Sequence, residues 1–307
     1  MDEVDHYVAR SVLPAMGIAG RPFTLRPPAE AGTRSSLRLI EPEGMPPLLL
    51  RIFDHRTQAA RNAGALRHLE SLDLPAPRLV FHEGWRSRIT VETWVEGTRH
   101  AGIADHALAR AAALSVASLL ATYHRVTRDR WGRPDTLLRP KLISFAAATL
   151  RAARGMTAAL RGQGWLEGAQ AASIDQRLGT WRQTIADITS YSLVHNDANR
   201  HNFIVSAAGA VTPIDLHRLA YEPFPEELIN ALYHFCRKDA ELAERFVERY
   251  FAKAGETARS TFDRTRGFFE PLNSLKKMHR RAAGSPPAGD PKMLRWRERV
   301  AALEAAT

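Results

Sequence analysis

The chain contains very little cysteine. Cys236 is the single cysteine among 307 residues, so no disulfide framework can form. It lies in the apolar run Leu232-Tyr233-His234-Phe235-Cys236, which predicts a buried thiol. A chain without disulfides suits a reducing compartment, and we expect a cytoplasmic protein.

Long hydrophobic runs are also missing. Residues 1–6 are acidic and polar, without the basic and apolar regions of a secretory signal peptide. The apolar stretch 111–120 is interrupted by Ser115 and Ser118, and is much shorter than the roughly 20 residues of a membrane span. We therefore expect no integral membrane segment.

Signatures of nucleic-acid binding are absent too. The sequence has no zinc-finger or helix-turn-helix motif and no basic motif interleaved with aromatic residues, so we expect no nucleic-acid partner. No internal repeat is visible, and nothing in the sequence indicates an oligomeric state.

Positive charge, in contrast, is in excess. Lys and Arg number 43 against 33 acidic residues, which gives a net charge of +10 that attracts anions. One cluster contains Lys276, Lys277, His279, Arg280, Arg281, Lys292, Arg295, Arg297 and Arg299. Two interpretations stay open: a solvated helix face, or a dock for a phosphorylated or membrane-bound substrate. The second would bring the protein into peripheral contact with an anionic inner membrane.

The order of predicted elements changes along the chain. Short apolar runs predict strands at 23–26, 36–40, 48–53, 78–81 and 88–92, with a helix at 57–72. From residue 104 the pattern is almost wholly helical, apart from strand character at 192–214. We predict an α+β fold with two lobes: a small β-rich N-terminal lobe, residues 1–96, and a larger α-helical lobe, residues 97–307.

The strongest functional signal is the pattern His-x-Asp-x-x-x-x-Asn at residues 195–202. Asp197 can accept or orient the proton of an attacking hydroxyl, and Asn202 offers a neutral amide oxygen to Mg²⁺. A hairpin predicted over 203–214 returns the chain to Asp215, so Asp215 should lie beside Asn202 and complete a magnesium site. His195 is expected to pack under the loop and bond a backbone group.

These residues resemble a known superfamily. From about residue 37 to 250 the chain is similar to the aminoglycoside phosphotransferase and choline kinase group within the protein-kinase-like fold. Locally, Ile214-Asp215-Leu216-His217-Arg218, Asp197-x-Asn199-x-His201-Asn202 and residues 228–251 look like the bacterial lipopolysaccharide core kinases. The resemblance implies a kinase that uses ATP and Mg²⁺ and phosphorylates a small molecule or sugar. The narrower likeness implies a lipopolysaccharide core sugar, or its precursor, as acceptor.

The nucleotide clamp departs from the family pattern. The family's phosphate-gripping lysine falls at Arg51, and the helix glutamate that pairs with it falls near Asn62. No glycine-rich loop is present, and residues 31–36, including Ser35, would supply donors to phosphate instead. The resemblance places adenine against strand 90–95, with Glu92 and Trp94 among the nucleotide-binding residues.

The acceptor is expected to be small. Asp215 is followed by Leu216-His217-Arg218, and a helix is predicted to begin near Pro225, which leaves no room for a peptide-binding activation segment. In the resembled kinases an insert before the catalytic loop helps build the acceptor pocket. Here that insert contains Trp131, Trp165, Trp181, Arg151, Arg154 and Arg161, although tryptophans at these spacings can equally fill the core. The alternative to an enzyme is a nucleotide-binding pseudokinase or adaptor, which Arg51 and Asn62 favour.

Overall fold

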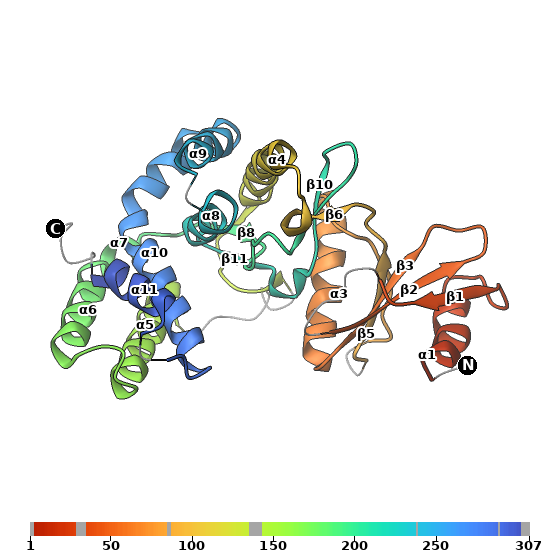
Figure 1. The fold of residues 1–307 in the computed structure, drawn as a ribbon, viewed down its shortest axis with the longest axis horizontal. Helices are drawn as coiled ribbons and strands as arrows, with labels where there is room; N and C mark the ends of the chain where they lie inside the picture. Colours follow the sequence, from red (N-terminus) through yellow and green to blue (C-terminus); the bar gives the residue numbers. More distant parts are fainter. Residues whose placement is uncertain are drawn as a thin grey trace. The chain divides into compact units, whose positions relative to one another are not determined.

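A computed structural model describes residues 3–28, 35–84, 87–134, 143–237, 239–287 and 289–301 (Figure 1). The chain forms two compact units. Unit 1 comprises Met1–Val116, Arg133–Thr136 and His195–Ala220, and unit 2 comprises Ala117–Gly132, Leu137–Val194 and Tyr221–Thr307. The predicted boundary between residues 96 and 97 stays a prediction.

Unit 1 is built on a five-stranded sheet in the order β1-β2-β3-β5-β4. Its strands are β1 Phe23–Arg26, β2 Ser35–Pro42, β3 Leu48–Phe53, β4 Leu79–Phe81 and β5 Ile89–Thr93, and every neighbouring pair is antiparallel. The strands predicted from apolar runs are confirmed within one or two residues at their ends.

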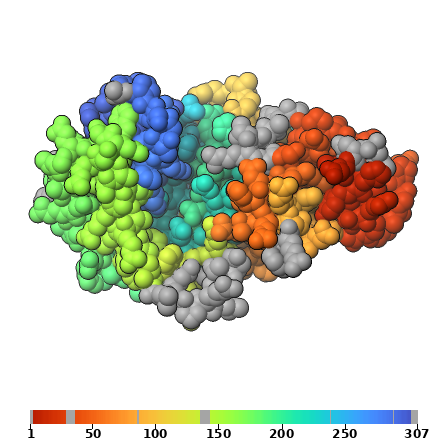
Figure 2. Space-filling model, turned by 90° about the horizontal axis from the view of Figure 1, so that it is seen from below, coloured from red at the N-terminus to blue at the C-terminus, as the bar shows by residue number. Residues whose placement is uncertain are grey.

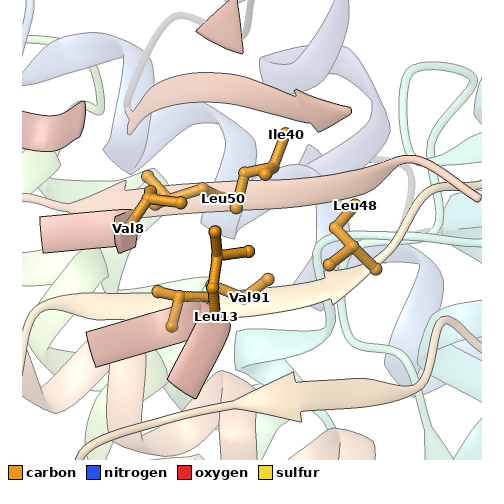
Figure 3. Close-up of a cluster of buried hydrophobic side chains, with 7 residues drawn as sticks. Val8, Leu13, Ile40, Leu48, Leu50 and Val91 are labelled. Carbon is orange, nitrogen blue, oxygen red and sulfur yellow. The ribbon is translucent and has the colours of Figure 1, made fainter. Parts of the chain in front are cut away.

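One face of this sheet is covered by the N-terminal segment α1 Glu3–Tyr7, η1 Val8–Val12 and α2 Leu13–Ala15. A buried apolar cluster joins the two layers (Figure 3): Val8, Val12, Leu13, Ile40, Leu48, Leu50 and Val91. Full burial of each large aliphatic side chain stabilises the fold by roughly 1.5–3 kcal/mol. Because side chains alternate along a strand, the positions between these, including Arg51, Thr90 and Glu92, face the other side.

The helix predicted at residues 57–72 is confirmed as α3 Arg56–Ser71, and it packs on that second side of the sheet (Figure 1). Its apolar residues recur at helical spacing and are buried: Ala59, Ala63, Leu66 and Leu69. The same stripe carries the buried polar residue Asn62, which therefore faces the sheet.

A second, smaller sheet of unit 1 has the order β10-β9-β6. Its strands are β6 Thr98–Arg99, β9 Phe203–Val205 and β10 Val211–Pro213. The hairpin predicted over 203–214 is confirmed, with Gly209 in the turn at φ 78°. The short helices η2 His100–Gly102 and η4 Leu216–Arg218 follow β6 and β10.

Unit 2 is mostly helical. Its small sheet β11-β8-β7 consists of Thr127–Arg128 (β7), Tyr191–Val194 (β8) and Ala220–Glu222 (β11). Its helices are α5 Phe145–Gly162, α6 Gly168–Thr180, α7 Arg182–Ala186, α8 Phe224–Ala231, η5 Leu232–Cys236, α9 Ala240–Ala254, α10 Glu256–Ala282 and α11 Pro291–Ala301. Helix α4 His106–His124 contributes to both units. Figure 2 shows α5 and α6 (lime and green) against the C-terminal helices (blue).

The core of unit 2 contains a buried polar network at the end of α4. His124 contacts the Tyr250 hydroxyl through Nδ1 at 2.7 Å and the Glu227 carboxylate through Nε2 at 2.9 Å. Both ring nitrogens are thus satisfied without water, as a buried imidazole requires. Cys236 is 2% exposed, which confirms the predicted buried thiol. Within the described residues, no helix is both long and apolar enough to cross a bilayer.

Candidate active site

The loop between β8 and β9 gathers the side chains of the His-x-Asp-x-x-x-x-Asn pattern. The Asn202 amide nitrogen donates to the Asp197 carbonyl oxygen at 2.9 Å and to its carboxylate Oδ2 at 3.2 Å. Asn199 donates to the other carboxylate oxygen at 3.2 Å. Both donors fix the rotamer of Asp197, and the amide oxygen of Asn202 is left for another partner.

Asp215 is brought to this loop by the β9–β10 hairpin. The Ile214 amide donates to the Asn202 carbonyl oxygen at 2.9 Å, which ties the end of the hairpin to the start. Asp215 itself has φ 63° and ψ 55°, a left-handed conformation that costs most residues energy but that aspartate tolerates. The predicted closeness of Asp215 and Asn202 is thus confirmed in the backbone.

The Asp215 carboxylate is held by an imidazole and a guanidinium. His217 Nδ1 lies 2.7 Å from Oδ1, and Arg51 Nη1 lies 3.4 Å from the same oxygen. Burial alone would raise the pKa of Asp215, but the His217 hydrogen bond and the Arg51 charge outweigh it and hold the pKa well below its usual range. Asp215 is therefore ionised, and its Oδ2 is the atom that remains for a cation.

Arg51 connects this carboxylate to the sheet. Its Nη2 lies 3.3 Å from Glu92 Oε1 on the neighbouring strand, and its guanidinium lies 5.6 Å from the Phe53 ring centroid. Asn62 on α3 donates to Glu92 Oε2 at 3.2 Å. Arg51 and Glu92 are 6% and 2% exposed, so this is a buried ion pair whose second carboxylate oxygen is satisfied by an amide.

His195 has the structural position expected of it. It is fully buried, its Nε2 donates to the Ile214 carbonyl oxygen at 2.9 Å, and its ring lies 5.6 Å from that of Phe203. His195 therefore links the end of β10 to β9.

A second brace comes from the segment before α4. Arg200 of the loop donates through Nε to His100 Nδ1 at 3.1 Å, and His100 Nε2 donates to the Ala109 carbonyl oxygen at 3.0 Å. Burial, assisted by the charge of Arg200, lowers the pKa of His100 to about 4, so the ring is neutral at pH 7. The loop that carries Asp197 is thus fixed to η2, and through His100 to α4.

The sequence also predicted Trp94, Ser35 and Glu92 as nucleotide-binding residues. The Trp94 amide donates to the Pro47 carbonyl oxygen at 3.2 Å and its side chain is half-buried. Ser35 begins β2, paired with Phe53, but its side chain and residues 31–34 lie outside the described residues. The Glu92 carboxylate points at Arg51 and Asn62, so a direct contact of this side chain with adenine finds no support. His217 was missed by sequence reasoning, and its position two residues after Asp215 was the available signal.

Most of the insert predicted to build an acceptor pocket lies in unit 2. Trp131 packs edge-on against Phe145, and the Trp181 ring centroid lies 6.1 Å from that of Phe268, while both tryptophans stay partly exposed. A groove of about 490 Å³ between α5 and α7 has Arg151, Arg154 and Arg182 among its lining residues.

Solved structures of three kinases resemble the whole chain. Aminoglycoside phosphotransferase APH(2'')-Ib with ADP bound has a TM-score of 0.62 at 15% identity, and the match covers 99% of each chain. A streptomycin–ATP complex of APH(2'')-IIa has a TM-score of 0.56 at 16% identity, covering 100% of this chain and 98% of that one. Choline kinase LicA from Streptococcus pneumoniae has a TM-score of 0.59 at 14% identity, covering 99% and 100%. These similarities establish a protein-kinase-like fold and confirm the predicted α+β class.

The sequence profile of the phosphotransferase enzyme family matches residues 24–268. The chain belongs to this family, and the prediction that it is a kinase is confirmed. No curated protein matches the chain in a sequence search.

Proposed function

We propose that the protein transfers the γ-phosphate of ATP to a hydroxyl of a small molecule or sugar, with Mg²⁺ as cofactor. The observation that carries the proposal is the convergence on one loop and hairpin of Asp197, Asn202 and Asp215, with the Arg51 guanidinium 3.4 Å from Asp215. All four residues belong to unit 1. Similar structures contain ATP or ADP, which supports a nucleotide at the equivalent place.

The donor set fits magnesium. Asp215 has a free carboxylate oxygen kept ionised by its neighbours, and Asn202 has an amide oxygen not used by Asp197. Hard oxygen ligands of this kind, one charged and one neutral, suit a Mg²⁺ whose other ligands are phosphate and water. When bound, the ion would neutralise charge on the transferring phosphoryl group.

The protein groups would act mainly by position and charge. Asp197, whose carboxylate is oriented by Asn199 and Asn202, would accept or orient the proton of the acceptor hydroxyl. Arg51 would steady the nucleotide phosphates as a fork of donors. Because both are held by neighbours before substrate arrives, little reorganisation is needed during transfer.

Glu92 is proposed as a positioning residue for Arg51. In the resembled kinases a glutamate on the helix holds the phosphate-binding cation, whereas here the helix position is Asn62. The carboxylate comes instead from β5, and Asn62 supports it through a hydrogen bond of 3.2 Å. Compared with the resembled kinases, arginine stands at the position of the lysine, and its carboxylate partner comes from a strand and not from the helix. Because the cation keeps a carboxylate partner, this arrangement supports a working nucleotide clamp.

For the acceptor, the structural neighbours, which include a gentamicin complex of APH(2'')-IIa and a choline kinase, point to small hydroxyl compounds such as aminoglycosides and choline. The lipopolysaccharide core sugar suggested by residues 214–218 belongs to the same chemical class and stays a proposal. A screen for Mg·ATP phosphotransfer to aminoglycosides, choline-like alcohols, free sugars and lipopolysaccharide core would test it. The Asp197→Asn variant is the control, with nucleotide affinity nearly intact and transfer slower by at least 100-fold. Equal turnover of the variant would remove Asp197 from its role.

The second candidate is a nucleotide-binding pseudokinase. The observation in its favour is that Arg51 and His217 both contact Oδ1 of Asp215, so only Oδ2 of this carboxylate is left for a metal ion. In that case nucleotide would bind without transfer to any acceptor of the screen. The intact set of Asp197, Asn202 and Asp215 supports the enzyme instead.

A further inference from the structure

Among the described residues, a nearly buried lysine in helix α10 forms no ion pair with a carboxylate. Lys277 is 8% exposed, and its Nζ lies 3.5 Å from the centroid of the Tyr233 ring. The guanidinium carbon of Arg299, on α11, lies 5.8 Å from the same ring. Two cations therefore share one aromatic ring, and Arg280 follows Lys277 by one helical turn.

Two carboxylates of the described residues in this region are already engaged by other cations. Glu226 on α8 binds Lys276 through both oxygens, at 2.5 and 2.7 Å, and Asp290 binds Arg281. Within the part of the chain that the structure describes, neither Lys277, Arg280 nor Arg299 forms an ion pair. The sequence cluster is thus divided into paired cations and an unpaired set.

We propose that Lys277 and Arg299 at the Tyr233 ring, together with Arg280 one turn further along α10, form a binding site for a phosphate monoester group. A buried ammonium needs compensating negative charge, and one aromatic face offsets only part of its lost hydration. A phosphate dianion carries several acceptor oxygens, which suit one point donor and two guanidinium forks. All these residues lie in unit 2, so the site stands independently of the proposed nucleotide site.

The electrostatics of Lys277 agree with this geometry. Burial, followed by the charges of Arg280 and Arg299, lowers the pKa of Lys277 to about 7, while Glu226 acts in the opposite direction. The three cations therefore repel one another, and the repulsion is relieved by an anion between them. If Lys277 served only for packing, placing its ammonium beside two guanidinium groups would bring no stabilisation.

The test uses inorganic phosphate as the probe and thermal unfolding of the full chain as the readout. Phosphate should raise the melting temperature of the wild type more than chloride at equal ionic strength. This phosphate-dependent rise in melting temperature should fall by at least half in Lys277→Met and in Arg299→Gln. It should persist in Arg264→Gln, which removes an exposed arginine from the same helix, and in Arg51→Met, which alters the nucleotide site. Persistence in Arg51→Met separates this site from the proposed kinase function.

Two outcomes would overturn the site. One is an equal phosphate increment in the wild type, Lys277→Met and Arg299→Gln. The other is a Lys277→Met variant that is less stable than the wild type by the same amount in chloride and in phosphate, because a packing role does not depend on the anion. Since Arg280 and Arg299 are exposed, Arg280→Gln and Arg299→Gln should fold and keep the test decisive. Glycerol phosphate and phosphatidate vesicles, compared by direct binding, then distinguish a soluble ester from a lipid headgroup as its source.

Discussion

At the scale of single residues, Arg51 is the most informative position. It contacts a carboxylate of the sheet, Glu92, and a carboxylate of the hairpin, Asp215, at 3.3 and 3.4 Å. A residue with two such partners is oriented even before nucleotide binds, which lysine with its flexible stem would achieve less well. Its Nε atom is buried without a hydrogen-bond partner among the described residues. An unsatisfied buried donor lowers stability, so we expect Arg51 to be retained for a function and not for stability alone.

Glu92→Gln tests the positioning role of this carboxylate. Removing one charge of a buried pair costs about 3–5 kcal/mol of stability when no other group compensates. Because Arg51 also contacts the Asp215 carboxylate, we expect a loss near the lower end of this range. We expect the KM for ATP to rise by roughly tenfold, equivalent to about 1.4 kcal/mol, with a smaller effect on kcat. Steady-state kinetics and urea unfolding measure the two effects.

The control for Glu92→Gln is the same substitution at Glu41. Glu41 pairs with Arg26 at 2.9 Å on the surface of the same sheet, and an exposed pair contributes little. Glu41→Gln should therefore leave both stability and KM nearly unchanged. An unaltered KM in Glu92→Gln would show that Arg51 needs no orientation by the sheet.

His100 predicts a pH effect on stability. Its pKa is lowered by burial from the ordinary 6.5 to about 4, so the unfolded chain binds a proton in this range that the folded protein does not. The contribution of His100 to stability is therefore complete above pH 6.5 and decreases as the pH falls toward 4. His100→Gln should be less stable at pH 7 and should lose less stability than the wild type between pH 6.5 and 4.

Urea unfolding at several pH values measures this difference. The exposed His6, changed to Gln, serves as a control that removes a histidine without removing a buried one. Parallel stability curves for the wild type and His100→Gln would contradict the neutral, buried imidazole that braces Arg200.

At the scale of elements, the hairpin β9–β10 depends on a glycine outside it. Gly97 has φ 141°, and a Cβ atom there would lie 2.3 Å from the Val205 carbonyl oxygen. The close approach lets β6 pair with β9, so the sequence needs glycine where strand β6 begins.

Gly97→Ala should separate β6 from β9. The clash involves backbone atoms and cannot be relieved by a rotamer change, so we expect a loss of about 2–4 kcal/mol. Because β9 leads from Asn202, phosphotransfer should fall as well. Gly209→Ala is the matched control, because Gly209 also has a positive φ, 78°, but a Cβ added there would meet no described non-neighbouring atom within 4 Å. This substitution should lower stability by only about 1 kcal/mol. Calorimetry that gave equal losses for both would contradict the steric argument.

Sequence pattern predicted these elements well and their side-chain partners poorly. The strands and the hairpin follow from alternation and from turn residues such as Gly209, which act locally. The pairing of Arg51 with Glu92 depends instead on the register Arg51↔Thr90 and Leu49↔Glu92 between strands far apart in sequence. No local signal sets that register. The sequence therefore indicated that Asn62 could not form the family's ion pair, but not which residue would replace its partner.

At the scale of the whole molecule, the excess of positive charge is divided between different kinds of environment. Arg51 is buried against carboxylates in unit 1, whereas Lys277 is buried against an aromatic ring in unit 2. Many of the others lie exposed, where a net charge of +10 draws anionic ligands toward the protein by long-range attraction. Composition alone predicted the attraction, but burial and pairing decide which cations can bind specifically.

Nucleotide binding should appear in the stability of the molecule as a whole. A ligand that binds only the folded state at 100 times its Kd stabilises that state by about 2.7 kcal/mol, so Mg·ATP should raise the melting temperature clearly. ATP without Mg²⁺ should have a smaller effect, because the ionised Asp215 then faces the phosphates uncompensated. In Asp215→Ala the additional stabilisation by Mg²⁺ should disappear.

Thermal unfolding with and without a chelator measures all three cases, and a wild-type shift that is identical with and without Mg²⁺ would exclude Asp215 and Asn202 as the metal site. A Mg²⁺-dependent shift without transfer to any acceptor would favour the pseudokinase, so this measurement together with the acceptor screen separates the two proposed functions.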